Sequence, residues 1–249
     1  MELDIITIGF LASLLAGLAT GVGAIPVLFI RKISDRILDS MLGFAAGVML
    51  SATSFSLIIP SIELGSIWVS VMGLILGASS MFLIEHYTPH LHFISGQEGP
   101  SSTLSRIWLL IFAITLHNFP EGLAVGVSFG GGDVSGGLVI AMAIGLQNMP
   151  EGLAVALPLI REKYTRKKAL WYATATGLVE PVGGFLGVAI VALFEPILPW
   201  GLAFAAGAML FVVSHEMIPE SHRKGFQREA TLGVIAGFVV MMFLDNLFT

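Results

Sequence analysis

The chain has 249 residues, of which 55% are hydrophobic and only 12% are charged. Soluble globular domains carry about 25% charged residues, so this composition excludes a soluble domain and indicates an integral membrane protein in a lipid bilayer. The net charge of -5 decides little, and no nucleic-acid partner is expected. Because the chain contains no cysteine, disulfides and thiolate metal ligands are both excluded.

Eight apolar segments follow one another with short connections, and each is near the ~20 residues that span a bilayer as a helix. Because backbone polar groups must be satisfied internally in lipid, these segments are predicted to be helices. The predicted fold is an all-α integral membrane protein, a single transmembrane domain over residues 1–249. The predicted helices are about 5–30, 40–60, 66–87, 107–129, 135–160, 169–194, 198–218 and 230–249.

Basic residues predict the orientation of the chain, because cytoplasmic loops carry an excess of lysine and arginine. All 12 of them lie in the connections between helices one and two, three and four, five and six, and seven and eight. These connections are therefore predicted to be cytoplasmic, with both termini on the external or periplasmic side of the cell (inner) membrane. The basic residues are Arg31, Lys32, Arg36, Arg106, Arg161, Lys163, Arg166, Lys167, Lys168, Arg223, Lys224 and Arg228.

Two sequence repeats indicate internal symmetry. Residues 116–125, LHNFPEGLAV, return as residues 146–155, LQNMPEGLAV, in the next helix. Residues 44–50, FAAGVML, return as residues 204–210, FAAGAML. The predicted topology gives the helices of each pair opposite directions, which favours inverted repeats in a 3+2+3 arrangement typical of transporters. Small-residue helix packing is an alternative explanation for the shorter match.

The longer repeat places ionisable and amide side chains inside apolar helices. Residues four apart share a helix face, so His117 points the same way as Glu121, and Gln147 the same way as Glu151. The two helices form a hairpin, so the two motifs are expected to meet near the middle of the membrane. Ionisable residues inside membrane segments are costly and usually functional.

Three more polar side chains complete this set. Asn118 and Asn148 lie at the edges of the same two faces, and Glu180 adds an acid in the sixth helix. Pro120 and Pro150 are expected to widen their helices and to free a carbonyl oxygen. Three buried carboxylates without a basic residue in any membrane core require a cation. Imidazole, carboxylate and amide ligands without sulfur suit zinc and would also admit Fe, Mn, Co and Cd.

The motifs HNFPEG at 117–122 and QNMPEG at 147–152 resemble the signature helices of the ZIP (Zrt/Irt-like) divalent metal transporters, in their bacterial and archaeal branch. The resemblance covers the whole chain and implies a binuclear metal centre midway along the transport path. Many members have His where this chain has Gln147, and some have Asp where it has Asn148. The amides of this chain are the weaker metal ligands. The implied first position consists of His117, Glu121, Gln147 and Glu151, and the second of Asn118, Asn148 and Glu180, with Glu121 and Glu151 bridging.

The resemblance implies import of Zn²⁺, or of Fe²⁺, Mn²⁺, Co²⁺ or Cd²⁺, into the cytoplasm by alternating access with an elevator-like displacement. The metal is expected to be the transported substrate. Neither a prosthetic group nor an enzymatic activity is expected. A homodimer is compatible with the family. An exporter or a metal sensor remains an alternative. An intramembrane metalloprotease is a further alternative, but the nearest string, HEMIP at 215–219, lacks the second His of the His-Glu-x-x-His motif.

Five of the six histidines lie on the predicted cytoplasmic side, where metal would leave. His215 and Glu216 lie inside an apolar helix and resemble an exit-side metal site of the family. His86, His90 and His92 lie at the end of the third helix and in the following loop, which is thought to take up or sense metal in family members. A solvated loop with incidental histidines is the alternative for His90 and His92.

Overall fold

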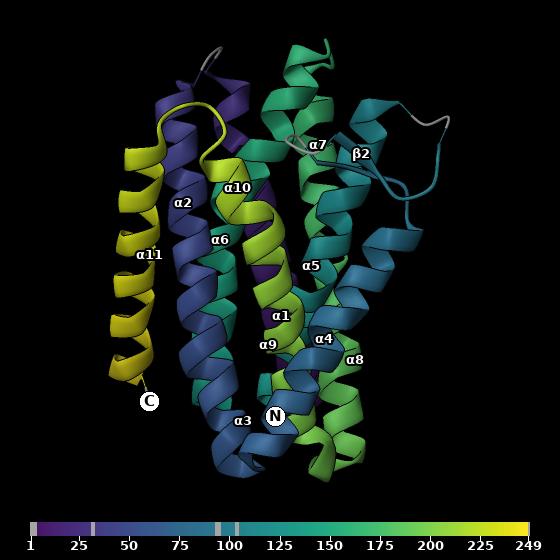
Figure 1. The fold of residues 1–249 in the computed structure, drawn as a ribbon, viewed down its shortest axis with the longest axis vertical. Coiled ribbons are helices and arrows are strands. Elements are labelled where there is room, and N and C mark those ends of the chain that lie inside the picture. The colour runs from purple at the N-terminus through teal and green to yellow at the C-terminus, as the bar shows by residue number, and fades with distance from the viewer. Residues whose placement is uncertain (1–3, 31–32, 93–95, 103–104, 249) are drawn as a thin grey trace.

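The computed structural model describes residues 4–30, 33–92, 96–102 and 105–248. In this part of the chain, eight helical segments are long and apolar enough to cross a membrane, which confirms the eight predicted helices. Figure 1 shows them as an upright bundle in which both ends of the chain lie toward the same end.

The first span ends in a 3-10 turn, the second contains a π-helical turn between two α-helices, and the third is a single α-helix. Side chains cap the helices: Asp4, Ser34 and Ser66 each accept a hydrogen bond from the N–H group three residues on. The second span begins at Asp35, earlier than the predicted residue 40. Hydropathy missed this start because the first turn of the helix is polar. The elements are α1 Ile5–Ala24, η1 Ile25–Leu28, α2 Asp35–Ser51, η2 Ala52–Ile58, α3 Ile59–Leu64 and α4 Ile67–Tyr87.

A short antiparallel ribbon follows the third span, with His90 opposite Glu98. The next two helices, α5 and α6, form a hairpin whose turn ends at Asp133, the N-cap of α6. The remaining elements are β1 His90–His92, β2 Gly96–Glu98, α5 Arg106–Gly130, α6 Val134–Arg161, α7 Arg166–Gly177, α8 Glu180–Leu193, η3 Glu195–Ile197, α9 Leu198–Val212, η4 Val213–Met217, α10 Ile218–Ser221 and α11 Gln227–Phe248.

Two π-helical turns, η2 and η4, interrupt the second and seventh spans, and an Ile-Pro pair follows each of them. Such turns widen a helix locally and are frequent at functional sites. The prediction that Pro120 and Pro150 widen their own helices is wrong, since α5 and α6 stay α-helical through both prolines. A membrane helix tolerates proline where neighbouring helices pack around it.

Close helix crossings hold the two repeated motifs in place. A Cβ atom at Gly122 of α5 would collide with the carbonyl oxygen of Glu180 in α8. A Cβ atom at Gly152 of α6 would collide with the carbonyl oxygen of Thr20 in α1. Only glycine allows these backbone contacts, which bring α1, α5, α6 and α8 together around the polar residues of the motifs.

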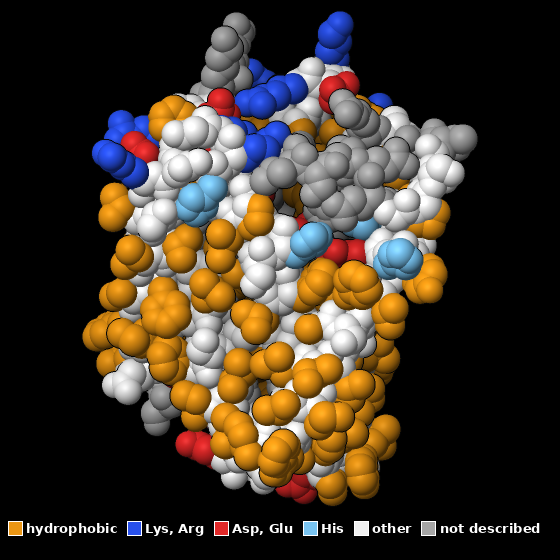
Figure 2. Space-filling model, in the orientation of Figure 1, with side chains coloured by type: hydrophobic (Ala, Val, Ile, Leu, Met, Phe, Trp, Pro, Cys, Tyr) orange, Lys and Arg blue, Asp and Glu red, His pale blue; other side chains and the backbone are white. Residues whose placement is uncertain are grey.

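Charge divides the surface of the bundle along its length. Figure 2 shows lysine and arginine gathered at one end, beyond a broad belt of hydrophobic side chains. At this end, Arg161 and Lys224 each lie 3.4 Å from the carboxylate of Asp35. Arg31 and Lys32, which also entered the orientation prediction, lie outside the described residues.

Candidate metal centre

All seven predicted ligands are buried inside the bundle. None exposes more than 7% of its surface, although every one of them is polar or ionisable. Burial of such groups is costly unless they are hydrogen-bonded, paired or bound to a metal. The seven are His117, Asn118, Glu121, Gln147, Asn148, Glu151 and Glu180.

Two amides of α6 tie this helix to its neighbours. The Gln147 side-chain nitrogen donates to Oε1 of Glu121 in α5 at 2.6 Å. The Asn148 side-chain nitrogen donates to Oε1 of Glu180 in α8 at 2.7 Å and to the carbonyl oxygen of Ala16 in α1 at 2.8 Å. Both amides therefore use their nitrogens as donors to protein oxygens, so each has a carbonyl oxygen left to offer a cation.

Three buried carboxylates belong to this group: Glu121, Glu151 and Glu180. Like charges buried together in a low-dielectric interior repel one another strongly. The sequence between residues 107 and 160 contains no lysine or arginine that could compensate these charges. A divalent cation is the partner that this arrangement favours.

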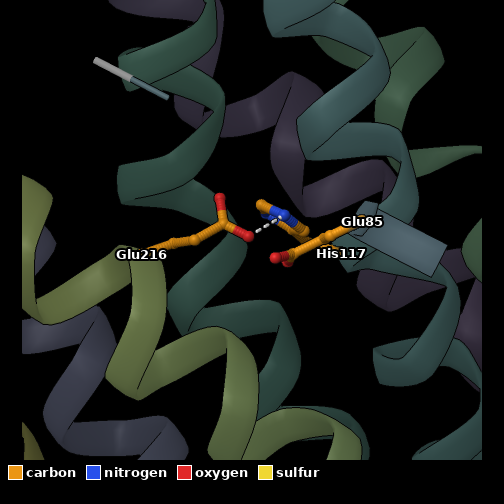
Figure 3. A group of neighbouring side chains, drawn as sticks. All are labelled: Glu85, His117 and Glu216. Atoms are coloured by element: carbon orange, nitrogen blue, oxygen red, sulfur yellow. Dashed lines mark ion pairs between the residues drawn. The ribbon is translucent and has the colours of Figure 1, made fainter. Parts of the chain in front are cut away.

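His117 belongs to a second group of ligands beside the first. Its Nε2 forms an ion pair with Oε1 of Glu216, and a ligand atom of Glu85 joins them, so that the three atoms lie within 4.8 Å of one another. Figure 3 shows the three side chains pointing toward one another from separate helices. One imidazole and two carboxylates are the ligand types that zinc accepts in catalytic and transport sites without cysteine.

Glu85 is the ligand candidate that sequence reasoning missed. It lies in the last turn of α4, where a charged residue is easily interpreted as facing the membrane surface. Its relative exposure is only 5%. The signal that could have found it is its position as the only acid between residues 67 and 87, since a lone acid in an apolar helix points to a buried partner.

The predicted exit-side residues separate into different surroundings. Glu216 lies against His117, and His215 lies 3.6 Å from Glu85 with 41% of its side chain exposed. His86 is exposed and stacks on Phe82, away from this group. His90 is buried, and its Nδ1 lies 2.7 Å from the carbonyl oxygen of Thr88. The side chain of His92 lies outside the described part of the chain.

Several buried polar atoms of the centre have no hydrogen-bond partner in the described part of the chain. They include both amide atoms of Asn118, Oδ1 of Asn148, Oε2 of Glu121, Oε1 of Glu151 and Oε2 of Glu180. Each such atom costs about 1–3 kcal/mol. The donor set of oxygens with one imidazole fits a divalent transition-metal ion, which would coordinate the oxygens among these atoms and neutralise the acids.

The spans and the buried polar side chains define a class: a multi-pass helical membrane protein with imidazole, carboxylate and amide groups buried at its centre. The model of the ZIP zinc transporter family matches residues 94–245, and the chain belongs to this family.

Three relatives show how far the likeness extends. The chain is 47% identical to the zinc transporter GufA of Myxococcus xanthus over 95% of this chain and 97% of the relative. It is 46% identical to the zinc transporter ZIPB of Bordetella bronchiseptica, over 92% and 77% of the two chains. It is 35% identical to the human zinc transporter ZIP11, over 91% and 93%. The family is one of transporters and not of enzymes, so the metalloprotease alternative has no support.

Proposed function

We propose that the protein imports divalent transition-metal ions into the cytoplasm, Zn²⁺ first and also Fe²⁺, Mn²⁺, Co²⁺ and Cd²⁺. The relatives named above are all called zinc transporters, which supports this substrate class. The observation that carries the proposal is a set of buried carboxylate and amide oxygens midway along α5 and α6 that have no hydrogen-bond partner among the described residues. A passing ion would satisfy these atoms without becoming a permanent part of the fold.

The ligands form a path toward the basic end of the bundle. Helix α5 starts at that end, so His117 lies about one helical turn nearer to it than Glu121. From His117 the path continues to Glu85, and Glu85 lies 3.6 Å from the half-exposed His215. In the proposed route an ion passes from the carboxylates around Glu121 to His117 and leaves near His215.

The proposed orientation places the basic end in the cytoplasm and both termini outside, in the cell (inner) membrane. It is supported by the gathering of lysine and arginine at the end opposite the termini (Figures 1 and 2). The proposed 3+2+3 arrangement of inverted repeats is supported by the equivalent π-turns η2 and η4. Residues 1–249 would form one transporter domain that works by alternating access, with α5 and α6 displaced against the other helices.

The proposed ligands are the seven predicted residues, in the two positions that the family resemblance implies, together with two acids nearer the exit. Glu85 and Glu216 join this set because they approach the imidazole of His117. His215 is the proposed last ligand before the cytoplasm. A homodimer belongs to the same proposal, and light scattering of the purified protein in detergent would test it.

Removing a central carboxylate tests the function. We expect Glu121→Ala or Glu151→Ala to abolish zinc uptake into proteoliposomes, because either change removes a charge that an ion must compensate. Glu162→Ala, which changes an exposed acid in the loop between α6 and α7, is the matched control and should transport like the wild type. Near wild-type uptake by a folded Glu121→Ala or Glu151→Ala variant would contradict the proposed centre.

A further inference from the structure

An apolar hollow of about 350 Å³ opens between two pairs of helices, and none of the proposed metal ligands lines it. Its walls come from α4, α5, α8 and α9, and the atoms exposed inside it are all apolar. The wall residues used below are Leu76, Ile190 and Trp200.

The hollow lies inside the membrane-spanning part of the bundle. All four helices that line it belong to spans long and apolar enough to cross a bilayer. Leu76 and Ile190 expose 50% and 51% of their surfaces, so the hollow is continuous with the apolar outer surface that faces the lipid. Trp200, near the start of α9, forms part of the wall.

Water does not suit this space. A buried water needs two to four polar partners, and apolar cavities of about 150 Å³ stay dry and bind small hydrocarbons. The hollow is larger than that and offers apolar atoms alone. The medium on its open side is hydrocarbon, so the molecule with both access and matching chemistry is a lipid acyl chain.

We propose that an acyl chain of a bilayer lipid occupies this hollow as a resident wedge between the pair α5 and α8 and the pair α4 and α9. The first pair carries Glu121 and Glu180, and the span that contains α9 continues into Glu216. During transport, the two pairs of helices would slide past each other along the acyl chain. That consequence rests on the proposed function, whereas occupancy by lipid does not.

Tryptophan fluorescence tests occupancy without any metal. A variant with Trp68, Trp108 and Trp171 changed to Phe keeps Trp200 alone, and a second variant keeps Trp68 alone, which is 76% exposed against 37% for Trp200. Both are reconstituted in phosphatidylcholine with a rising fraction of lipid brominated on its acyl chains. Quenching by general lipid contact would follow exposure and be stronger at Trp68. We expect the larger loss of fluorescence at Trp200, already at low fractions of brominated lipid.

Narrowing the opening of the hollow provides a second test. Ile190→Phe, at the half-exposed rim, should reduce the quenching of Trp200, because the larger side chain fills the entrance. Leu186→Phe, one turn earlier on α8 and also lipid-exposed, should leave it unchanged. Stronger quenching at Trp68, or equal quenching of Trp200 in the two Phe variants, would overturn the inference. Zinc uptake is measured separately, so failure of the uptake test would leave this result standing.

Discussion

At the scale of single residues, two amides connect α6 to the acids of neighbouring helices. Gln147 and Asn148 donate to Glu121 and Glu180 at 2.6 and 2.7 Å. A hydrogen bond to an ionised acceptor is worth more than one between neutral groups, so these contacts stabilise the buried acids. Because both amide nitrogens act as donors, a metal ion at the proposed centre would meet the neutral carbonyl oxygens of these two side chains.

Glu85 gives a prediction at the same scale. We expect Glu85→Gln to weaken zinc binding by roughly 10- to 100-fold, the range seen when a group supporting a metal ligand is removed. Calorimetric titration of the purified protein with zinc measures the change. His86→Gln is the matched control, since the adjacent side chain is exposed and stacks on Phe82. Equal affinities of the two variants would exclude Glu85 from the metal path.

At the scale of elements, contact between α1 and α6 depends on where glycine occurs along α6. At Gly152 a Cβ atom would collide with the carbonyl oxygen of Thr20, whereas at Gly145 the nearest atoms lie 3.9 Å away. In α6, position 152 therefore requires glycine, whereas position 145 has room for a larger side chain. The first lies inside the repeated motif, so packing and ligand placement share the same turn.

The two glycines predict opposite effects on stability. Gly152→Ala should destabilise the protein by about 1–3 kcal/mol, as overpacking does. Gly145→Ala should be neutral or stabilise it by up to about 1 kcal/mol, because alanine favours the helix. Thermal unfolding in detergent, followed by loss of the folded peak in size-exclusion chromatography, measures both. A Gly152→Ala variant as stable as Gly145→Ala would show that α1 and α6 are not in this contact.

At the scale of the whole molecule, the asymmetry of charge supports the proposed orientation in the membrane. Lysine and arginine gather at the end opposite the termini (Figures 1 and 2), and cytoplasmic surfaces carry this excess in membrane proteins. The proposed ligand path from Glu121 through His117 leads toward the same end. The charge distribution thus supports the orientation, whereas the proposed direction of transport rests on the family resemblance.

The sequence contains no cysteine, so an introduced cysteine is the only thiol in the protein and labels one position. This makes the orientation easy to test. We expect Lys167→Cys, in the exposed first turn of α7, to resist a membrane-impermeant maleimide in intact cells and to react after permeabilisation. Glu195→Cys, exposed at the opposite end, should react in intact cells. Labelling of Lys167→Cys without permeabilisation would reverse the proposed topology.

Much of the fold could be predicted because a bilayer restricts the chain to helices of about 20 apolar residues. All eight spans were found from hydropathy, with bounds that differ by a few residues. The largest difference is at Asp35, where a polar first turn hides the start of the helix. Widened turns were expected at Pro120 and Pro150 but lie in η2 and η4, because packing against other spans decides where a helix is distorted. The ribbon β1–β2 left no hydropathy signal.

The sequence by itself determined the membrane class and the helical spans, because hydropathy depends on near neighbours in the chain. Its motifs also determined the family and the residues that are buried at the centre, because residues four apart share one face of a helix. Only the tertiary structure decided which of these residues meet. His117 lies with Glu216 and the unpredicted Glu85, while Glu121 accepts from Gln147. Contacts between separate helices depend on how the helices cross, and no spacing along one helix contains that information.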